Sequence, residues 1–372
     1  MTAPDLVFGW RTALLSVAGA QMLVIAAALA RTLRNRLSNR CLATLLVVLA
    51  GLLTPYAIGF AGFYDRYPWL SFAPFAIPLA VGPLLYFHAH ALALGRLPAR
   101  PLLHLAPALL QFAYQAVSFC LPLALKLRWD GIASPLVDPV VTAGIVVGLA
   151  GYCVASLRLL ARYRIALAQQ RSDDDLYAAL WLSRTVAAMI ALLAAWIAYT
   201  AWDRLVAPLD YFGELGLYLI IALVGCYLAV EGWRHAQLSF VPALIAAATA
   251  SPPPVERDWR ALGEQWAAQV RSTRAFVDPE LSLGSLARLL GTNSTHLSRA
   301  INEGLGMNFS TFIATLRCEE VAAALRAGSR NDLLGLALDS GFGSKASFNR
   351  AFQTVFGLSP SAYRVRHGSD QQ

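Results

Sequence analysis

Apolar positions run almost unbroken through the first two thirds of the chain, where seven stretches lack any acidic or basic side chain. Most reach or approach the roughly 20 residues that a helix needs to cross a hydrocarbon layer about 30 Å thick. The stretches are residues 12–30, 41–64, 67–95, 101–125, 139–157, 185–202 and 215–230. Seven buried helices of a large soluble core are the alternative, but soluble helices seldom lack a polar face so consistently. The pattern therefore predicts seven transmembrane helices within residues 1–234.

Two of the seven stretches differ from a simple straight transmembrane helix. Residues 69–93 contain Pro74, Pro78 and Pro83, so the third helix is predicted to be kinked or broken. The stretch 215–230 is too short to cross a bilayer alone, and we extend it to residues 211–233.

Basic residues are distributed unevenly over the connections between these helices, eleven on one side and five on the other. The positive-inside rule then places the N-terminus outside and the C-terminus in the cytoplasm. Residues 28–30 imitate a signal-peptidase site, but cleavage there would leave the Arg-rich segment 31–40 outside, so an uncleaved helix is favoured. The inner residues are Arg31, Arg34, Arg36, Arg40, Arg96, Arg100, Arg158, Arg162, Arg164, Arg171 and Arg234, and the outer ones are Arg11, Arg66, Lys126, Arg128 and Arg204.

Composition agrees with a membrane protein: 57% of the residues are hydrophobic, 14% are charged, and the mean hydropathy is +0.53. Residues 1–234 hold 17 basic and 11 acidic residues, and the remainder holds 13 and 11. Most of the net charge of +8 therefore belongs to the membrane part, and charge alone does not indicate nucleic acid. None of the five cysteines forms a CxxC pair, so neither a disulfide framework nor a metal site is implied.

The pattern changes after residue 234, where a small-residue segment leads to a run of three prolines at 252–254. Such a run favours extended polyproline geometry and acts as a semi-rigid spacer. Shorter, amphipathic helices follow, including one with Trp259, Leu262, Trp266 and Val270 on one face. In residues 336–352, Gly341 can take the left-handed turn between two helices, while Phe348 and Phe352 give the second helix an apolar face. This arrangement is typical of a helix-turn-helix.

Two sets of motifs occur in the last 100 or so residues. They are Leu281–Leu283, Leu286-Ala287, Gly291, His296–Arg299, Ile301–Gly306 and Phe309 in the first half, and Arg317, Ala337–Phe352, Gly357, Ser359-Pro360 and Tyr363-Arg364 in the second. These motifs resemble the AraC/XylS-type DNA-binding domain. The resemblance implies two helix-turn-helix subdomains joined by a long helix, with two recognition helices in successive major grooves about 34 Å apart. In helix number and order, the whole chain resembles membrane-tethered members with seven helices ahead of this domain.

The expected fold class is thus all-α, a seven-helix transmembrane bundle followed by a two-subdomain DNA-binding domain. The expected domains are a sensor at 1–234, a Pro-rich linker at 235–257, the DNA-binding domain at 258–366 and a flexible tail at 367–372.

Helical geometry predicts which polar residues of the two recognition helices face DNA. Arg299 and Arg350 suit bidentate contact with guanine, and Asn349 or Gln353 suits adenine. Ser344 and Lys345 suit a phosphate at the start of the second helix. Ordinary solvated polar faces are the alternative. With Ser347, which the resemblance alone implies, the full predicted set is Thr295, Ser298, Arg299, Asn302, Ser344, Lys345, Ser347, Asn349, Arg350 and Gln353. The contact positions of the family correspond to Thr295, Ser298, Arg299, Lys345, Ser347 and Arg350.

Polar residues of the membrane part are candidates for sensing, although interhelical hydrogen bonding is the commoner role of such groups. The candidates are Gln111, Gln115, Asp203, Asp210 and Glu214. His88 and His90 define no metal geometry, and no cofactor is expected. Walker, HExxH and GxSxG motifs are absent from the sequence, so we expect no enzyme activity.

The expected function is a one-component transcriptional regulator of a bacterial inner membrane. Its expected partners are double-stranded DNA, the lipid bilayer, an unknown small-molecule or envelope signal, and a second copy of the chain. A transporter or lipid-modifying protein with a regulatory DNA-binding domain is one alternative, and release of a soluble factor by proteolysis near 236–256 is another.

Overall fold

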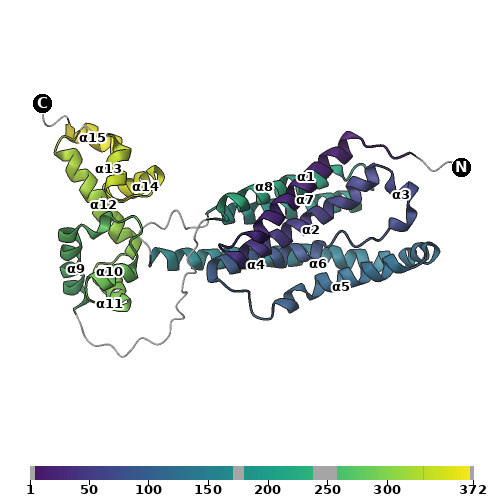
Figure 1. Ribbon diagram of the computed structural model, residues 1–372, viewed down its shortest axis with the longest axis horizontal. Helices are drawn as coiled ribbons and strands as arrows, with labels where there is room; N and C mark the ends of the chain where they lie inside the picture. Colours follow the sequence, from purple (N-terminus) through teal and green to yellow (C-terminus); the bar gives the residue numbers. More distant parts are fainter. Residues whose placement is uncertain (1–4, 171–179, 238–257, 330, 369–372) are drawn as a thin grey trace. The chain divides into compact units, whose positions relative to one another are not determined.

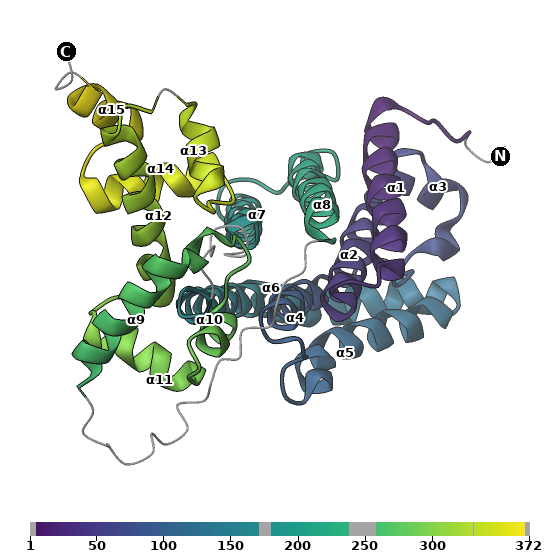
Figure 2. The ribbon, with the colours of Figure 1, turned by 60° about the vertical axis from the view of Figure 1, so that its left-hand side comes forward.

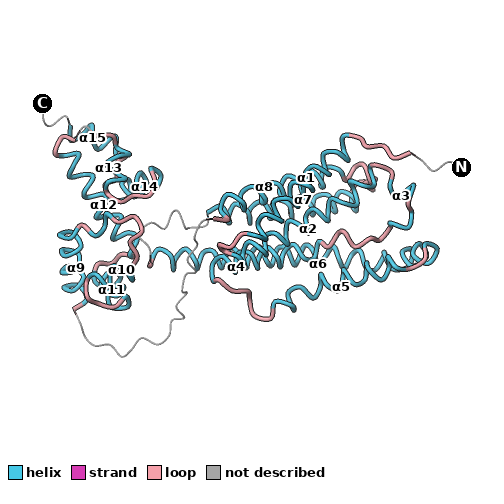
Figure 3. The backbone as a smooth tube through the Cα atoms, in the orientation of Figure 1, coloured by secondary structure: helices cyan, strands magenta, loops and turns pink. Residues whose placement is uncertain are grey.

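The computed structural model describes residues 5–170, 180–237, 258–329 and 331–368, and these residues form helices, turns and loops without a strand (Figure 3). The expected all-α class is confirmed. The chain divides into two compact units. The first unit contains residues 5–160 and 180–237, which we call the apolar bundle. The second contains residues 258–368, which we call the C-terminal unit, together with residues 161–170. Most of the predicted linker, residues 238–257, and the tail residues 369–372 lie outside the described residues.

Six helices of the chain are long and apolar enough to cross a membrane, judged by length and composition among the described residues. They are α1 (Trp10–Arg31), α2 (Arg36–Phe60), α5 (Pro101–Cys120), α6 (Leu123–Ala168), α7 (Leu180–Leu205) and α8 (Leu215–His235) (Figure 1). Each corresponds to one of the seven predicted helices. The third predicted helix differs from the others.

Residues 67–95 form a short helix with an irregular approach. A short helix α3 (Phe63–Arg66) and two 3₁₀ turns, η1 (Pro68–Leu70) and η2 (Pro78–Ala80), precede α4 (Val81–Leu94). Pro78 opens η2, and Pro83 lies in the first turn of α4, where a missing N–H breaks no helical hydrogen bond. The apolar helical segment 78–94 is therefore too short to count with the six.

Helix α6 also differs from the sequence pattern, which places Lys126 and Arg128 in a connection between two helices. Only Leu121 and Pro122 separate α5 from α6, and α6 continues for 46 residues through Pro135 and Pro139. Lys126 is buried, and its Nζ donates to the carbonyl oxygens of Trp69 at 2.9 Å and Ser71 at 3.3 Å. The basic side chain thus anchors the loop before α4 instead of facing solvent.

Small residues let the helices of the apolar bundle approach closely. A Cβ atom on Gly225 of α8 would lie 2.4 Å from Sδ of Met22 in α1, and one on Gly232 would lie 2.2 Å from Leu42 of α2. Such close packing is the usual source of helix association where lipid removes the hydrophobic driving force.

The C-terminal unit contains two small helical cores joined by one long helix. The unit consists of α9 (Trp259–Thr273), η3 (Ala275–Val277), α10 (Leu283–Leu289), α11 (Ser294–Arg299) with a π turn η4 at Ala300–Gly304, α12 (Phe309–Arg326), α13 (Leu333–Asp339), α14 (Lys345–Phe356) and α15 (Pro360–Gly368). Helix α12 gives residues 309–316 to the first core and residues 318–325 to the second. Figure 2 shows α12 between the two sets of helices. The predicted pair of subdomains joined by a long helix is confirmed.

Arg317 lies on α12 where the two cores meet, and it is 1% exposed. Its Nε donates to the carbonyl oxygen of Phe276 at 2.7 Å, and one terminal nitrogen donates to that of Asp278 at 2.8 Å. Its guanidinium lies 5.8 Å from the ring centre of Phe342, which belongs to the second core. One buried cation therefore connects the backbone of the first subdomain to the turn of the second.

Gly341 makes the same junction possible. Its φ angle is +92°, and an added Cβ atom would lie 2.5 Å from the carbonyl oxygen of Val277 and 2.9 Å from that of Phe276. The turn of the second helix-turn-helix therefore packs directly on backbone of the first subdomain. Both the left-handed conformation and the close approach require glycine.

We predict that Gly341→Ala destabilises the C-terminal unit more than Gly357→Ala does. Both positions have positive φ, which costs about 1–2 kcal/mol for alanine, but Gly357 has open space around its Cα. Gly341→Ala adds a backbone clash worth about 1–3 kcal/mol. Urea unfolding of the fragment 258–368 measures both changes. Equal losses for the two variants would show that the contact between the subdomains contributes nothing.

Candidate nucleic-acid interface

Side-chain caps fix where both candidate recognition helices begin. The Asn293 side chain accepts a hydrogen bond from the backbone N–H of His296 at 2.8 Å and starts α11. The Ser344 hydroxyl accepts one from the N–H of Ser347 at 3.2 Å and starts α14. These bonds satisfy N–H groups that a helix start leaves without partners. The polar residues that follow each cap therefore occupy defined positions.

Three predicted residues of α11 and its π turn occupy one stripe of the helix. Thr295 is exposed, while Ser298 and Asn302 are half-buried. The Asn302 amide donates to the Ser298 hydroxyl at 3.1 Å, so these two side chains hold each other. The stripe presents short hydroxyl and amide groups, which suit hydrogen bonds to base edges or phosphates.

Arg299 lies on the neighbouring stripe and is held there by two partners. Its Nε and a terminal nitrogen donate to the two Glu303 carboxylate oxygens at 2.9 and 3.1 Å. Its guanidinium carbon lies 4.6 Å from the centre of the Trp259 ring, at the start of α9. The hydrogen bond with Glu303 raises the pKa of Arg299. A guanine contact would require Arg299 to exchange this carboxylate for the base.

Sequence reasoning missed this arrangement around Arg299. The i to i+4 spacing of Arg299 and Glu303 is visible in the sequence and favours an ion pair. The contribution of Trp259 is not visible, because it depends on how α9 packs against the π turn.

The second helix presents a longer exposed polar surface. Lys345, Asn349, Arg350 and Gln353 are all exposed on α14. Ser347, by contrast, is buried, and its hydroxyl donates to the Ser344 carbonyl oxygen at 2.8 Å. In this conformation Ser347 supports the helix start, while Ser344 remains exposed beside Lys345.

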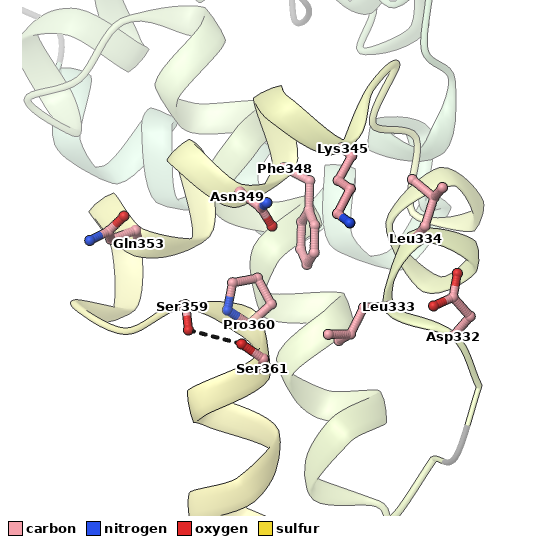
Figure 4. A pocket seen from close by; sticks show the side chains of 10 residues that line it. All are labelled: Asp332, Leu333, Leu334, Lys345, Phe348, Asn349, Gln353, Ser359, Pro360 and Ser361. Atoms are coloured by element: carbon pink, nitrogen blue, oxygen red, sulfur yellow. Dashed lines mark hydrogen bonds between the residues drawn. The ribbon is translucent and has the colours of Figure 1, made fainter.

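A hollow of about 440 Å³ lies beside α14 (Figure 4). Lys345, Asn349 and Gln353 line it from α14, one turn apart. Ser359, Pro360 and Ser361 line the opposite wall at the start of α15, and the Ser359 hydroxyl accepts from the N–H of Ala362 at 3.2 Å. Asp332 also lines the hollow, with its carboxylate accepting from the N–H of Gly335 at the start of α13. A lysine, two amides and a helix N-terminus suit a phosphate next to the recognition helix.

The five candidate sensing residues do not form one site. The carboxylates of Asp203 and Asp210 accept from the backbone N–H groups of Leu209 and Gly213 in the loop before α8. The Glu214 carboxylate accepts from the Tyr56 hydroxyl within an aromatic cluster that includes Tyr211 and Tyr218. These three carboxylates have structural partners.

The two glutamines lie on α5 and contact the backbone of the segment before α4. The Gln115 amide nitrogen donates to the carbonyl oxygen of Ala76 at 3.0 Å, and the Gln111 oxygen accepts from the N–H of Leu79 at 3.4 Å. Gln111 additionally lines a pocket, which is described below.

Within the part of the chain that the structure describes, no group of three or more His, Cys, Asp or Glu side chains is placed to hold a metal ion. Cys318 is buried in the second core of the C-terminal unit, and burial raises the pKa of its thiol to about 12. A thiol so protected is inert as a nucleophile or metal ligand.

Comparisons with known proteins agree with this geometry for the C-terminal unit. Residues 286–366 match a family model described as a helix-turn-helix domain. An uncharacterized HTH-type transcriptional regulator, SAS0078 of Staphylococcus aureus strain MSSA476, is 35% identical over 85 residues, 23% of this chain and 11% of that protein. The right origin-binding protein of Escherichia coli K12 is 34% identical over 88 residues, 24% of this chain and 30% of that protein.

Among solved structures, the C-terminal domain of AraT, a response regulator from Geobacillus stearothermophilus, is 26% identical, with a TM-score of 0.25 over 28% of this chain and 84% of that chain. The chain spans about a tenth of the length of the staphylococcal relatives. The family match at residues 286–366, which lies in the C-terminal unit, and the HTH-type relatives show that the C-terminus of the chain carries an AraC-type helix-turn-helix domain.

We predict that Glu303→Gln increases DNA affinity by releasing Arg299. An exposed pair within one helix is weak, so the gain should be about twofold to fivefold. The measurement is binding to operator DNA at fixed salt, with Glu319→Gln as the control, since that change removes the same charge from a pair with Arg271 on another surface. An equal gain in both variants, or a gain that persists after Arg299→Ala, would assign the effect to net charge alone.

Proposed function

We propose that the protein is a membrane-anchored transcriptional regulator that reads DNA with its C-terminal unit. The supporting observation is one chain that joins an AraC-type helix-turn-helix domain to six helices long and apolar enough to cross a bilayer. A DNA-binding domain acts only in the compartment that holds the genome. The proposal therefore places the C-terminal unit in the cytoplasm of a bacterium and the apolar bundle in its inner membrane.

DNA recognition is assigned to the two helices α11 and α14. Their exposed groups are Thr295 with Ser298 and Asn302 on α11 and its π turn, and Lys345, Asn349, Arg350 and Gln353 on α14. Arg350 is the leading candidate for a specific base contact, because an exposed guanidinium matches the two acceptors of guanine. Arg299 joins the interface when its pair with Glu303 opens. Ser344, Ser347 and Lys345 position the helix start near a phosphate.

The rigid junction between the subdomains supports reading of two consecutive DNA segments. Arg317 and Gly341 fix the first subdomain against the second, so the separation of α11 and α14 does not depend on a flexible linker. Two helices held at fixed separation can enter successive major grooves only on one face of the duplex. The proposed role of the apolar bundle is to convert a signal into a change in the position or pairing of this unit between copies of the chain.

The decisive experiment is mapping of the sites that the full-length protein occupies on the chromosome. Specific occupancy near promoters that is lost with the C-terminal unit supports a regulator. Uniform background occupancy, together with solute transport by vesicles that contain the protein, supports a transporter instead.

We predict that Arg350→Ala weakens binding to a mapped operator by about 1–3 kcal/mol and relaxes the preference at one base pair. Arg350→Lys retains the charge without the planar fork, so base preference should fall there as well. Arg260→Ala removes a charge from α9, where Arg260 pairs with Glu264, and should leave base preference unchanged. Operator variants titrated at one salt concentration measure these effects. Unchanged preference in Arg350→Ala would remove this residue from the base-reading set.

Topology gives a separate prediction. A cytoplasmic reporter fused after residue 372 should be active, and a reporter that works only in the periplasm should be silent, because basic residues favour the inner side of the membrane. The opposite result would place the C-terminal unit away from DNA and refute the proposed function.

A further inference from the structure

We propose that a pocket in the apolar bundle, between α4, α5 and α6, binds an uncharged amphiphile with an elongated hydrocarbon body. The inference deepens the proposed function, on which it rests for its biological meaning, by naming the chemical class of the signal. The pocket has a volume of about 610 Å³, within the range of roughly 300–1,000 Å³ that is common for small-molecule sites.

Two helix faces form the long walls of the pocket. On α5 the lining residues run from Leu103 and His104 to Tyr114, and on α6 from Leu136 to Tyr152, with Leu79 and Pro83 between the walls. Ten residues of α5 separate His104 from Tyr114, which corresponds to about 15 Å along the helix. The space is therefore long enough for an extended chain. Figures 1 and 2 place α5 at the margin of the bundle.

Missing side chains on α6 keep the pocket open. Gly144 and Gly148 lie one turn apart on the lining face. A Cβ atom on Gly148 would meet no atom within 4 Å, whereas one on Gly144 would lie 3.1 Å from the Leu79 side chain. The space beside Gly148 is thus available to a ligand and to a substituted side chain alike.

A few polar groups interrupt the apolar walls. At one end, Nδ1 of His104 and the Tyr152 hydroxyl are 2.9 Å apart. Gln111 lies between the ends, and at the other end the Tyr114 hydroxyl accepts from the Trp129 indole N–H at 3.2 Å. None of the described residues that line the pocket is Asp, Glu, Lys or Arg. The walls therefore match hydroxyl, carbonyl or amide groups on a ligand and disfavour a charged head group.

The rim of the pocket points to entry from the bilayer. Leu103, Leu110, Leu136 and Val140 on the rim are 64–73% exposed. In a membrane these side chains contact lipid, so a lipophilic molecule can enter sideways from the hydrocarbon layer. Transfer of a hydrocarbon chain from lipid to an apolar groove gains little free energy. Selectivity must then come from the polar groups, which have few hydrogen-bonding competitors in lipid.

The test uses full-length protein in phosphatidylcholine nanodiscs with a long-chain alcohol that carries a photoreactive diazirine in its chain. Peptide mapping by mass spectrometry locates the crosslinks. We expect labelling of the α5 and α6 peptides that line the pocket, with at least fivefold less when excess unlabelled alcohol competes. A phosphatidylcholine that carries the same diazirine should label exposed apolar positions elsewhere on the bundle.

Two variants test volume and polarity. Gly148→Leu should reduce pocket labelling at least fivefold by filling the space, whereas Gly151→Leu should not, since Gly151 also has open surroundings but lies off the pocket. Gln111→Leu, which retains side-chain size, should reduce labelling by the alcohol but not by the phospholipid. Thermal unfolding of each variant checks that the bundle is intact.

Two results would overturn the proposal. One is equal pocket labelling in Gly148→Leu and Gly151→Leu, and the other is pocket labelling by the phospholipid that excess alcohol does not reduce. Either result would show that the pocket is a crevice filled by bulk lipid. The crosslinking is measured without DNA. An absence of chromosomal binding sites would therefore refute the regulator proposal and leave the result for the pocket unaffected.

Discussion

The buried guanidinium of Arg317 is the interaction on which the geometry of the C-terminal unit depends. This guanidinium must have hydrogen-bond acceptors where it is buried, because an uncompensated charge in a protein interior is strongly destabilising. The carbonyl oxygens of Phe276 and Asp278 supply those acceptors, and they belong to the segment on which Gly341 packs. The two subdomains consequently share one polar junction between two apolar cores. A change in their relative position has to disturb the packing of Gly341 on Val277 and of Phe342 beside the guanidinium, so the junction opposes such a movement.

The two parts of the chain reach their structures by different balances of forces. In the C-terminal unit, burial of residues such as Phe309 and Phe352 removes apolar surface from water, and the caps satisfy the helix ends. If the apolar bundle lies in lipid, as we propose, the same residue types gain little by burial there. Close contacts at Gly225 and Gly232 and polar anchors such as Lys126 then determine how its helices meet.

Local signals in the sequence predicted most of the C-terminal unit. The start of α14 near Ser344, the turn glycine Gly341 and the apolar face of α14 depend on residues close in the sequence, so pattern and spacing reveal them. The prolines of residues 69–93 predicted the break in the third helix, which the structure shows as the irregular approach to α4. The continuous α6 was not predicted, because apolar composition does not distinguish a helix from a loop held by a distant group such as Lys126. The close approach at Gly341, the position of Trp259 over Arg299 and the pocket beside Gly148 likewise depend on packing between segments far apart in the sequence. A contact between residues far apart in the sequence leaves no local sequence pattern that would predict it.

The energies at these sites constrain how a signal acts. The exposed pair of Arg299 and Glu303 is too weak to switch DNA binding on its own, whereas typical allosteric couplings are about 1–3 kcal/mol. A ligand shifts an equilibrium only by the difference between its affinities for the two states. For an amphiphile in the proposed pocket, the two affinities differ if α5 and α6 are at different separations in the two states. The hydrogen bonds between the ligand and groups such as Gln111 then change between the states. In the regulator that we propose, the coupling therefore reaches the DNA-binding unit as a movement of whole helices, and the junction at Arg317 lets both recognition helices respond together.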